Sequence, residues 1–171
     1  YQRGEICYRS VSAIKSYYKR PKETADLYDK EGWLRSGDAG YYDEDGRLYI
    51  VDRLKQLIKC KGNQVVPAEL EDLLLREHGC EIAEVSVVGL PHNEFGEAPA
   101  AAVVLTEEGR RCDRQQLSDR IKATVEKNLA LHKHLHGGIF FVDSLPKTET
   151  AKVDRPALAS SLALGCKKAA K

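Results

Sequence analysis

The stretch LIKCKGNQVVPAELEDLLLREHG, residues 57–79, decides the fold of the longer part of the chain. Its first ten residues read as a small β-hairpin that turns at Gly62-Asn63, since such a pair between short apolar runs favours a tight turn. Pro67 suits the first position of a helix, and Gly79 suits its end. The acidic first turn of this helix holds Glu69, Glu71 and Asp72, and its apolar face holds Leu70, Leu73 and Leu74. The stretch thus opens a region in which strands and helices are expected to alternate.

Downstream of this stretch, apolar runs are typical of buried strands, and segments with helical spacing lie between and after them. Strands are expected over residues 82–90, 98–106 and 137–143, and helices over residues 113–130 and 156–164. Asp113 can cap the first of these helices. Because strands and helices interleave, residues from about 54 onward are predicted to form one compact α/β (α+β) domain.

The first 53 residues have a different texture, rich in β-forming residues. GEICYRS (4–10) alternates in polarity as a strand does, and Asp45-Gly46 within residues 38–53 is a strong hairpin signal. Residues 21–32 begin with proline and end with glycine, which suits a short helix. This part is predicted to be β-rich with little core of its own.

Composition limits the classes of function. The chain has 171 residues, 42% of them hydrophobic and 31% charged, which is typical of a soluble globular protein. A net charge of +1 argues against a nucleic-acid partner, and no apolar run is long enough for a membrane span. The five cysteines form no C-x-x-C pair, so a disulfide framework is not expected.

The turn Ser36-Gly37-Asp38 is a first candidate for chemistry. A carboxylate at a tight glycine turn can accept two hydroxyl hydrogen bonds, such as those of a ribose diol. An ordinary turn in which Asp38 bonds its own backbone is the alternative that the local residues favour.

Lysines form two further candidates. Lys55, Lys59 and Lys61 cluster near Gly62, and Lys59 and Lys61 are expected on one face of a strand, where an anionic ligand could bind. On spacing alone, a solvated charge run is the preferred interpretation. Lys152 stands alone in LPKTETAKVDR (145–155), and a loop lysine of this kind can reach an anionic transition state. Most exposed lysines have no such role.

Histidines at three alternating positions, His132, His134 and His136, would share one face of a strand and could bind a metal. No cysteine or carboxylate completes a recognisable ligand spacing, so no metal site is predicted. Surface histidines are the preferred interpretation.

The order of these motifs is more specific than any one of them. GWLRSGD (32–38), then DRLKQLIKCKGNQVVPAELE (52–71), then PKTETAKVDR (146–155) closely resembles the carboxyl-terminal part of the adenylate-forming enzymes. Within that superfamily, the chain is most similar to the branch of 4-coumarate–CoA ligases, acyl-CoA synthetases and beetle luciferases. The resemblance extends to about residue 160.

The resemblance implies a two-part organisation. Residues 1–53 would be the end of the large N-terminal adenylation domain, in its β-barrel subdomain. Residues 54–171 would be the small mixed-sheet C-terminal lid domain with flanking helices. The parent protein would be an ATP-dependent acyl- or aryl-CoA ligase, which adenylates a carboxylic acid and passes the acyl group to coenzyme A. A luciferase-like oxygenase and a non-catalytic module that kept the lid fold are the alternatives.

Roles for individual residues follow from the resemblance alone. Asp38 and Arg53 would hold the ATP ribose, Lys55 would be the hinge between the domains, and Lys152 would contact the substrate carboxylate and the α-phosphate. Three residues of the 57–66 hairpin would face the adenylate in the second step, with the glycine near the coenzyme A channel: Lys59, Gly62 and Gln64.

The chain departs from the family pattern in two places and lacks some of its motifs. Ala151 stands where the family usually has glycine, and alanine would strain the loop if that position needs a positive φ. RSVS (9–12) replaces the usual Arg-Gly-Pro start of its stretch. The phosphate loop ending in Pro-Lys-Gly and the glutamate that holds Mg²⁺ are absent, so they are expected in a missing N-terminal domain, and the chain alone should be inactive. The end, GCKKAAK, is not Ser-Lys-Leu, so the cytoplasm is the expected compartment, with the peroxisome left open.

Overall fold

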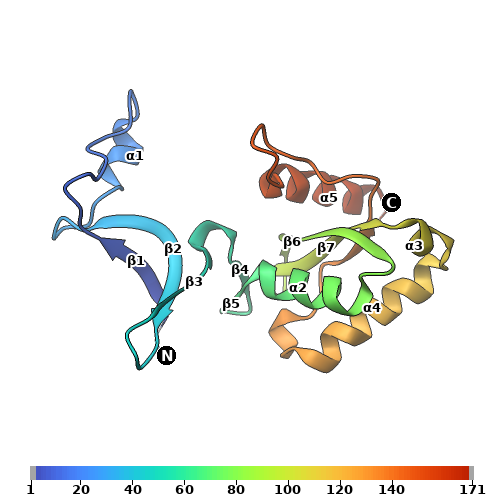
Figure 1. Cartoon of the computed structure of the whole chain (residues 1–171). Helices are drawn as coiled ribbons and strands as arrows, with labels where there is room; N and C mark the ends of the chain where they lie inside the picture. The colour runs from blue at the N-terminus through green and yellow to red at the C-terminus, as the bar shows by residue number, and fades with distance from the viewer. Residues whose placement is uncertain (1–2, 170–171) are drawn as a thin grey trace. The chain divides into compact units, whose positions relative to one another are not determined.

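The chain divides into two compact units, Tyr1–Lys55 and Gln56–Lys171. The computed structural model describes residues 3–169, and side chains as far as residue 164 (Figure 1). The assignment of the first unit to the end of an adenylation domain, and of the second to its lid, stays a prediction.

The first unit is a three-stranded antiparallel sheet with strand order β1-β2-β3, and so is β-rich as predicted. Its strands are β1 (Gly4–Tyr8), β2 (Leu34–Tyr42) and β3 (Leu48–Arg53), and its helix is α1 (Pro21–Ala25). The helix is shorter than the predicted segment to Gly32. It ends early because Tyr28 forms a β-bridge with Leu34, and the Asp29 carboxylate accepts hydrogen bonds from the backbone of Glu31 and Trp33. A side chain that bonds the backbone ahead of it competes with the helix.

The predicted hairpin at Asp45-Gly46 joins β2 to β3. Asp43 accepts hydrogen bonds from the backbone of Asp45 and Arg47, and Gly46 has a φ of +76°, which glycine adopts without strain. The prediction of a small core is also confirmed, since the buried apolar side chains of this unit within the described residues are Leu27, Leu34 and Ala39. Several large apolar side chains of the hairpin strands are instead exposed: Tyr42, Leu48, Tyr49 and Ile50.

The second unit is a mixed sheet between two layers of helix. Its strands are β4 (Ile58–Cys60), β5 (Asn63–Val65), β6 (Ile82–His92), β7 (Gly96–Leu105) and β8 (Gly138–Phe141). Its helices are α2 (Pro67–His78), α3 (Glu107–Arg111), α4 (Arg114–Asn128) and α5 (Arg155–Ala169), with a 3₁₀ turn at Leu131–Lys133. A further 3₁₀ turn, Leu54–Gln56, contains the boundary between the two units. The strand order is β5-β4-β7-β6, and β8 adds to β7 in parallel, so the predicted mixed sheet is confirmed.

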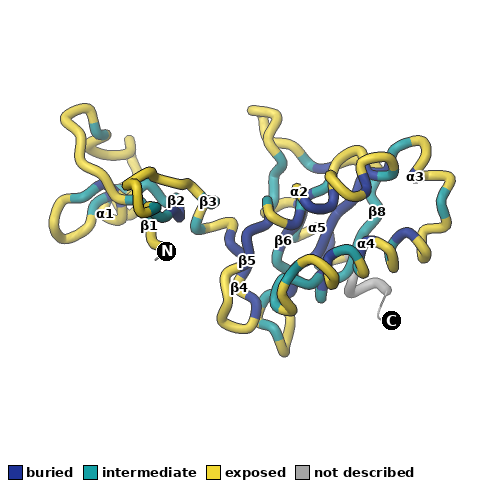
Figure 2. The backbone as a smooth tube through the Cα atoms, turned by 60° about the horizontal axis from the view of Figure 1, so that its bottom comes forward, coloured by how far each residue is buried: buried dark blue, intermediate teal, exposed yellow. Residues whose placement is uncertain are grey.

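Alternation along β6 and β7 sends side chains to both faces of this sheet, and each face has its own core. On one face, α2 and α4 pack on the sheet through fully buried side chains such as Leu70, Leu74 and Ile121. On the other face, Leu158 and Leu162 of α5 pack against the sheet. Figure 1 shows α5 on the opposite side of the sheet from α4, and Figure 2 shows the buried backbone running along the sheet between them. Burying one such leucine contributes about 1.5–3 kcal/mol.

Helix ends follow the sequence signals with one difference. The Asp113 carboxylate accepts a hydrogen bond from the backbone of Gln116 and caps α4, as predicted. Gly79 ends α2, but its φ of −62° is ordinary. A Cβ at this position would lie 2.7 Å from the backbone oxygen of Leu75, so glycine is needed for close approach rather than for a left-handed conformation.

His78, in the last turn of α2, is a buried titratable group between α2 and α4. The Thr124 hydroxyl donates to the backbone oxygen of Arg120 at 3.0 Å, so it accepts a hydrogen bond from His78 Nε2 at 2.8 Å. His78 Nδ1 lies 4.0 Å from a Glu81 carboxylate that is itself paired with Arg120 at 3.0 Å. Burial lowers the pKa of His78 from its ordinary value of 6.5, and the nearby Glu81 opposes that shift only in part.

We expect the stability of the protein to fall as pH drops below 6.5 because of His78. The folded state binds this proton less readily than the unfolded state, so the stabilisation is present above pH 6.5 and is lost as pH falls through the lower folded-state pKa. Urea unfolding at a series of pH values measures the slope. The variant His78→Gln should have a shallower slope between neutral and mildly acidic pH, and an unchanged slope would contradict the assignment.

Candidate functional site

The segment that carries Lys152 is a closed loop at the start of α5. Its ends are tied where Asp154 N donates to the Pro146 oxygen at 2.8 Å and Thr148 N donates to the Lys152 oxygen at 2.7 Å. Inside the loop, Ala151 N donates to the Thr148 oxygen at 2.9 Å. These bonds fix the backbone while the Lys152 side chain stays exposed. The loop therefore holds one ammonium group in solvent on a defined backbone, rather than burying it.

Ala151, the residue before Lys152, has a φ of +60°. This is the left-handed region, where a Cβ is too close to the neighbouring carbonyl and costs roughly 1–2 kcal/mol. A tight turn begins at Thr148, and Ala151 occupies the bulge position that follows it. This position needs a left-handed residue and therefore favours glycine. The suspicion of a strained alanine, raised by the sequence, is thus confirmed.

We expect Ala151→Gly to raise the free energy of unfolding by about 1 kcal/mol, because glycine removes the steric strain. Ala130 provides a matched control, since it is also exposed but has an ordinary φ of −66°. Ala130→Gly should lower stability by about 0.5–1 kcal/mol through the greater freedom of glycine in the unfolded chain. Urea unfolding of both variants checks this, and loss of stability in both would contradict the strain.

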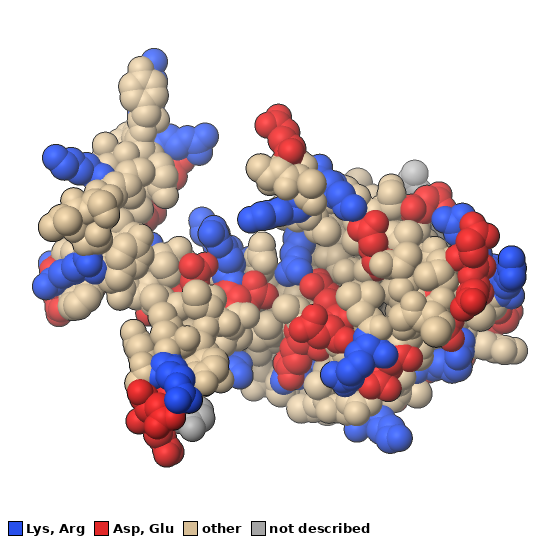
Figure 3. Space-filling model, in the orientation of Figure 1, with Lys and Arg blue, Asp and Glu red and all other residues tan. Residues whose placement is uncertain are grey.

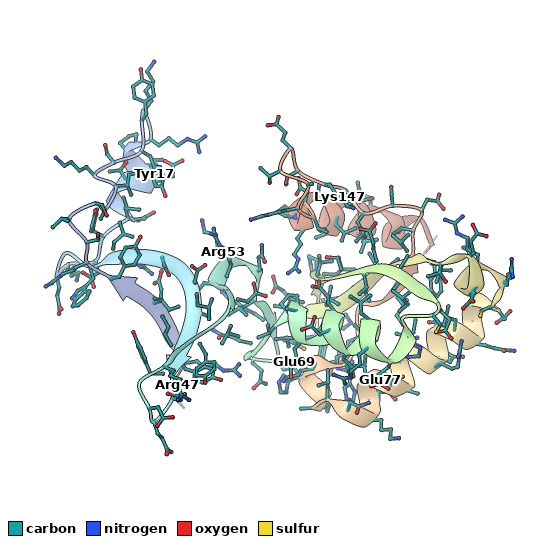
Figure 4. The ribbon with its side chains drawn as sticks, in the orientation of Figure 1. Tyr17, Arg47, Arg53, Glu69, Glu77 and Lys147 are labelled. Carbon is teal, nitrogen blue, oxygen red and sulfur yellow. The ribbon has the colours of Figure 1, made fainter. Side chains whose placement is uncertain are left out.

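Asp38 and Arg53 are brought together in the first unit by strand pairing. The two residues are directly opposite each other in the β2–β3 register, and Arg53 Nε lies 3.2 Å from Asp38 Oδ1. The alternative of an ordinary turn at Asp38 is wrong, because Asp38 lies inside β2. Figure 4 labels Arg53 at the end of β3. A carboxylate and a guanidinium side by side can accept from and donate to the same pair of hydroxyl groups.

An open depression of about 770 Å³ lies beside this pair in the first unit. Ser36 and Gly37 line it together with Arg53 and Lys55. Gly37 has a φ of +75°, and its N–H donates to a Glu5 carboxylate at 3.2 Å, which fixes this part of β2 at the wall of the depression. Arg53, predicted to contact the ribose, and Lys55, the predicted hinge, therefore border one concave surface, and Asp38 pairs with Arg53.

In the hairpin of β4 and β5, Lys59 and Gln64 are cross-strand partners, and both are exposed. The predicted turn at Gly62-Asn63 is wrong by one residue. Lys61 and Gly62 are the central residues, with φ of +49° and +77°, as a two-residue turn of this class requires.

This register places Ile58 opposite Val65 on the buried face and frees Val66 to lead into α2. It also means that Lys61 lies in the turn, so Lys59 and Lys61 do not share a strand face as predicted. Lys61 is engaged elsewhere. Its ammonium lies 2.9 Å from a Glu94 oxygen and 4.4 Å from the centre of the Phe95 ring.

The three histidines do not form the strand face that their spacing suggested. Leu131–Lys133 is a 3₁₀ turn, because its backbone closes short-range hydrogen bonds instead of pairing with a strand. Nε2 of His134 lies 3.1 Å from the Leu129 oxygen, and Nε2 of His136 lies 2.8 Å from the Leu131 oxygen. Among the described residues, no group of three His, Cys, Asp or Glu side chains is placed to hold a metal ion.

One pair of functional interest was missed by sequence reasoning. Arg155 donates two hydrogen bonds to the Glu71 carboxylate, at 2.8 and 2.9 Å. The sequence assigned Glu71 only to the acidic first turn of α2. The available signal was the arginine that follows Lys152 by three residues, but nothing in its spacing points to a partner 84 positions away.

Charge is distributed evenly over the face of the second unit that Figure 3 shows, with acidic and basic side chains interspersed. Within residues 3–169, no helix is both long and apolar enough to cross a membrane.

The family model of the AMP-binding enzyme C-terminal domain matches residues 69–152. Luciferin 4-monooxygenase of Photinus pyralis is 46% identical over 153 residues, which are 90% of this chain and 26% of that protein. 4-coumarate–CoA ligase 5 of Oryza sativa subsp. japonica is 43% identical over 164 residues, which are 96% of this chain and 29% of that protein.

Solved structures agree with this result. The o-succinylbenzoate CoA synthetase of Bacillus subtilis, in complex with the acyl-adenylate intermediate OSB-AMP, superposes with a TM-score of 0.76 at 33% identity, over 92% of this chain and 30% of that one. The chain therefore spans between a quarter and a third of the length of these relatives. Residues 69–152 belong to the AMP-binding enzyme C-terminal domain family, and the chain is homologous to the luciferases and 4-coumarate–CoA ligases of the adenylate-forming superfamily.

Proposed function

We propose that this chain is the C-terminal portion of an ATP-dependent acyl- or aryl-CoA ligase. Lys152 is the catalytic residue of the first step, Asp38 and Arg53 bind the ATP ribose, and Lys55 is the hinge. The hairpin residues Lys59, Gly62 and Gln64 serve the second step. The observation that carries the proposal is the closed loop that keeps Lys152 exposed on a fixed backbone.

In the first half-reaction, a carboxylate oxygen of the substrate attacks the α-phosphorus of ATP. A bond forms between that oxygen and phosphorus, and the bond from the α-phosphorus to the bridging oxygen breaks, so pyrophosphate leaves. Two anions must approach each other, and negative charge accumulates on the phosphoryl oxygens. An ammonium held in place stabilises that charge without reorganising during the reaction. Lys152 supplies this ammonium.

In the second half-reaction, the sulfur of coenzyme A attacks the acyl carbon. The carbon–sulfur bond forms, the carbon–oxygen bond to AMP breaks, AMP leaves, and the thiol proton passes to solvent. Lys152 and the β4–β5 hairpin belong to the same compact unit, Gln56–Lys171, so they move together. A rotation about Lys55 can therefore withdraw Lys152 and present the hairpin in one movement.

The remaining parts of the reaction lie outside this chain. Mg²⁺ and the acyl pocket are assigned to an upstream N-terminal domain. The sheet of the first unit supports such a partner, because Tyr42, Leu48 and Ile50 are exposed on its hairpin strands. Several large exposed apolar side chains on one small sheet are typical of a surface that contacts another part of the same protein.

A luciferase-like oxygenase is the second candidate. The luciferin 4-monooxygenase of Photinus pyralis is slightly more similar to this chain than the Oryza ligase, at 46% against 43% identity. Both candidates share the adenylation step and differ in what happens to the acyl-adenylate.

Product analysis of the parent protein tests the proposal. The protein is incubated with ATP, Mg²⁺ and a panel of aliphatic and aromatic carboxylic acids, and acyl-adenylate and acyl-CoA are measured by mass spectrometry with and without coenzyme A. Acyl-CoA formation is the expected result. Light emission from luciferin and oxygen without any acyl-CoA would favour the oxygenase, and no acyl-adenylate with any acid would contradict both.

A further inference from the structure

The strongest unassigned feature of the second unit is the Arg155–Glu71 pair. Both side chains are largely buried, with 20% and 15% of their surface exposed. The two hydrogen bonds of 2.8 and 2.9 Å run from one nitrogen of the guanidinium, Nη2, to both oxygens of the Glu71 carboxylate, which makes a charge-assisted contact. A third bond of 3.3 Å runs from the same guanidinium to the side-chain oxygen of Gln56.

Glu71 ties this pair to the edge of the sheet. Its Oε1 also accepts a hydrogen bond of 2.7 Å from the backbone N–H of Val87 in β6. β6 ends the strand order β5-β4-β7-β6, so one of its edges has no neighbouring strand in the described sheet. Glu71 belongs to α2 on one face of the sheet, and Arg155 begins α5 on the other. The pair thus joins the two helical layers around a strand edge.

Arg155 also lies at the foot of the Lys152 loop. Asp154, the residue before it, closes the loop through its N–H to Pro146 and caps α5 by accepting a hydrogen bond from Ala157 N. A displacement of the first turn of α5 would therefore move the loop. Gln56, the other partner of Arg155, is the first residue of the second unit and follows Lys55 directly.

We infer that Arg155 is a positioning residue for Lys152, held by Glu71, and that it sets where the ammonium lies when the carboxylate is adenylated. The inference rests on the proposed function for its effect on catalysis. The guanidinium of Arg155 is engaged by Glu71 and Gln56, so the role assigned to it is positioning rather than contact with the reacting atoms. Its guanidinium connects the base of the Lys152 loop with Gln56, beside the hinge, so the loop and the hinge-adjacent end of the unit keep a constant geometry.

The alternative is an ion pair that contributes only to folding. Glu69 allows the two to be separated, because it lies on the same helix two residues earlier and its carboxylate binds Lys133 Nζ at 2.6 and 2.7 Å. That pair joins α2 to the 3₁₀ turn at Leu131–Lys133. Glu69→Gln is therefore a matched control for Glu71→Gln, with a similar lost contact at a different place.

The test uses the parent protein and the variants Arg155→Gln, Arg155→Lys, Glu71→Gln and Glu69→Gln. Single-turnover assays measure acyl-adenylate formation from ATP, and thioester formation from supplied acyl-adenylate. Hydrogen exchange measures the amides of Thr148 and Asp154, whose bonds close the loop. Thermal unfolding identifies any variant that fails to fold.

We expect Arg155→Gln and Glu71→Gln each to slow adenylation by about 10- to 100-fold, the loss that a misplacement of about 1 Å produces. Thioester formation should stay within about twofold of wild type, since an interaction used in one step does not affect the other. A protein that carries both Arg155→Gln and Glu71→Gln should be no slower than either single variant, because both substitutions remove the same contact. Arg155→Lys should fold but should lower the adenylation rate, because one ammonium cannot replace two fixed nitrogens that donate to Glu71 and to Gln56.

Exchange at Thr148 and Asp154 should rise in Arg155→Gln and Glu71→Gln but not in Glu69→Gln. Equal losses in both half-reactions, losses in Glu69→Gln as large as in Glu71→Gln, or full activity in Arg155→Lys would overturn the inference. If the wild-type protein makes no acyl-adenylate, the proposed function fails, and hydrogen exchange still decides whether Arg155 holds the loop. Unchanged exchange at both amides in Arg155→Gln would refute it independently of activity.

Discussion

Lys152→Ala should lower the rate of acyl-adenylate formation by about 100-fold or more, the usual loss when one group that stabilises transition-state charge is removed. The ammonium stands on a closed loop with its side chain exposed, so removing it leaves the fold intact and deletes one charge. Thioester formation from supplied acyl-adenylate should be unaffected, because the proposed rotation withdraws Lys152 before that step. Single-turnover assays of the two half-reactions in the parent protein give this comparison.

Lys147 is the matched control for this prediction. It belongs to the same loop segment, as Figure 4 shows, and its ammonium pairs with Glu84 at 2.9 Å on an exposed surface. A pair of this kind contributes roughly 0–1 kcal/mol, so Lys147→Ala should leave both half-reactions close to wild type. Equal loss of both half-reactions in Lys152→Ala, or an equal effect of the two lysines on adenylation, would contradict the role of Lys152.

Asp38→Asn should raise the KM for ATP by about 10- to 100-fold, because hydrogen bonds to a charged group contribute about 1.5–3 kcal/mol. The substitution removes the charge that accepts the ribose hydroxyls and also ends the ion pair with Arg53. The shape of the side chain is retained, so the β2–β3 register should persist. Steady-state kinetics at varied ATP and saturating acid measure the change.

The control for Asp38 lies in the same unit. Asp45 pairs with Arg47 at 3.1 Å in the exposed hairpin turn, away from the depression that Arg53 lines. Asp45→Asn should leave the KM for ATP as in wild type. A KM that does not change in Asp38→Asn would remove Asp38 from the nucleotide site, whereas parallel increases in both variants would indicate a general loss of folding.

The repeating parts of the fold were predictable because their signals are local. Alternation in residues 82–90, the proline and acidic residues at the start of α2, and the Asp113 cap each act within a few residues of the chain. Errors occurred where two local preferences compete. Residues 21–32 carry helix-end signals, but Asp29 bonds the backbone ahead and ends the helix at Ala25. The β4–β5 turn moved by one residue because the pairing of Ile58 with Val65 determines the register.

The candidate site likewise combines features that the sequence predicted with features that it did not. The strain at Ala151 was raised as a condition by the resemblance, since the family usually has glycine there, and the structure gives this residue a φ of +60°. The pairing of Asp38 with Arg53 depends on a one-residue register shift between Ala39 and Gly40 in the β2–β3 ladder, which the Asp45-Gly46 turn does not determine. For the three histidines, the sequence favoured surface side chains over a metal site. The strand that a shared histidine face would need does not form, because the segment contains a 3₁₀ turn and two of the rings contact backbone oxygens.

By itself, the sequence determined the alternation of strands and helices, the turn that exposes Lys152, and the order of motifs that places the chain among adenylate-forming enzymes. Only the tertiary structure decided which carboxylate meets Arg155. That contact spans 84 positions and depends on how α2 and α5 pack on opposite faces of one sheet. Local preferences act over a few residues, whereas such a partner is selected by the packing of whole elements, which no short stretch of sequence encodes.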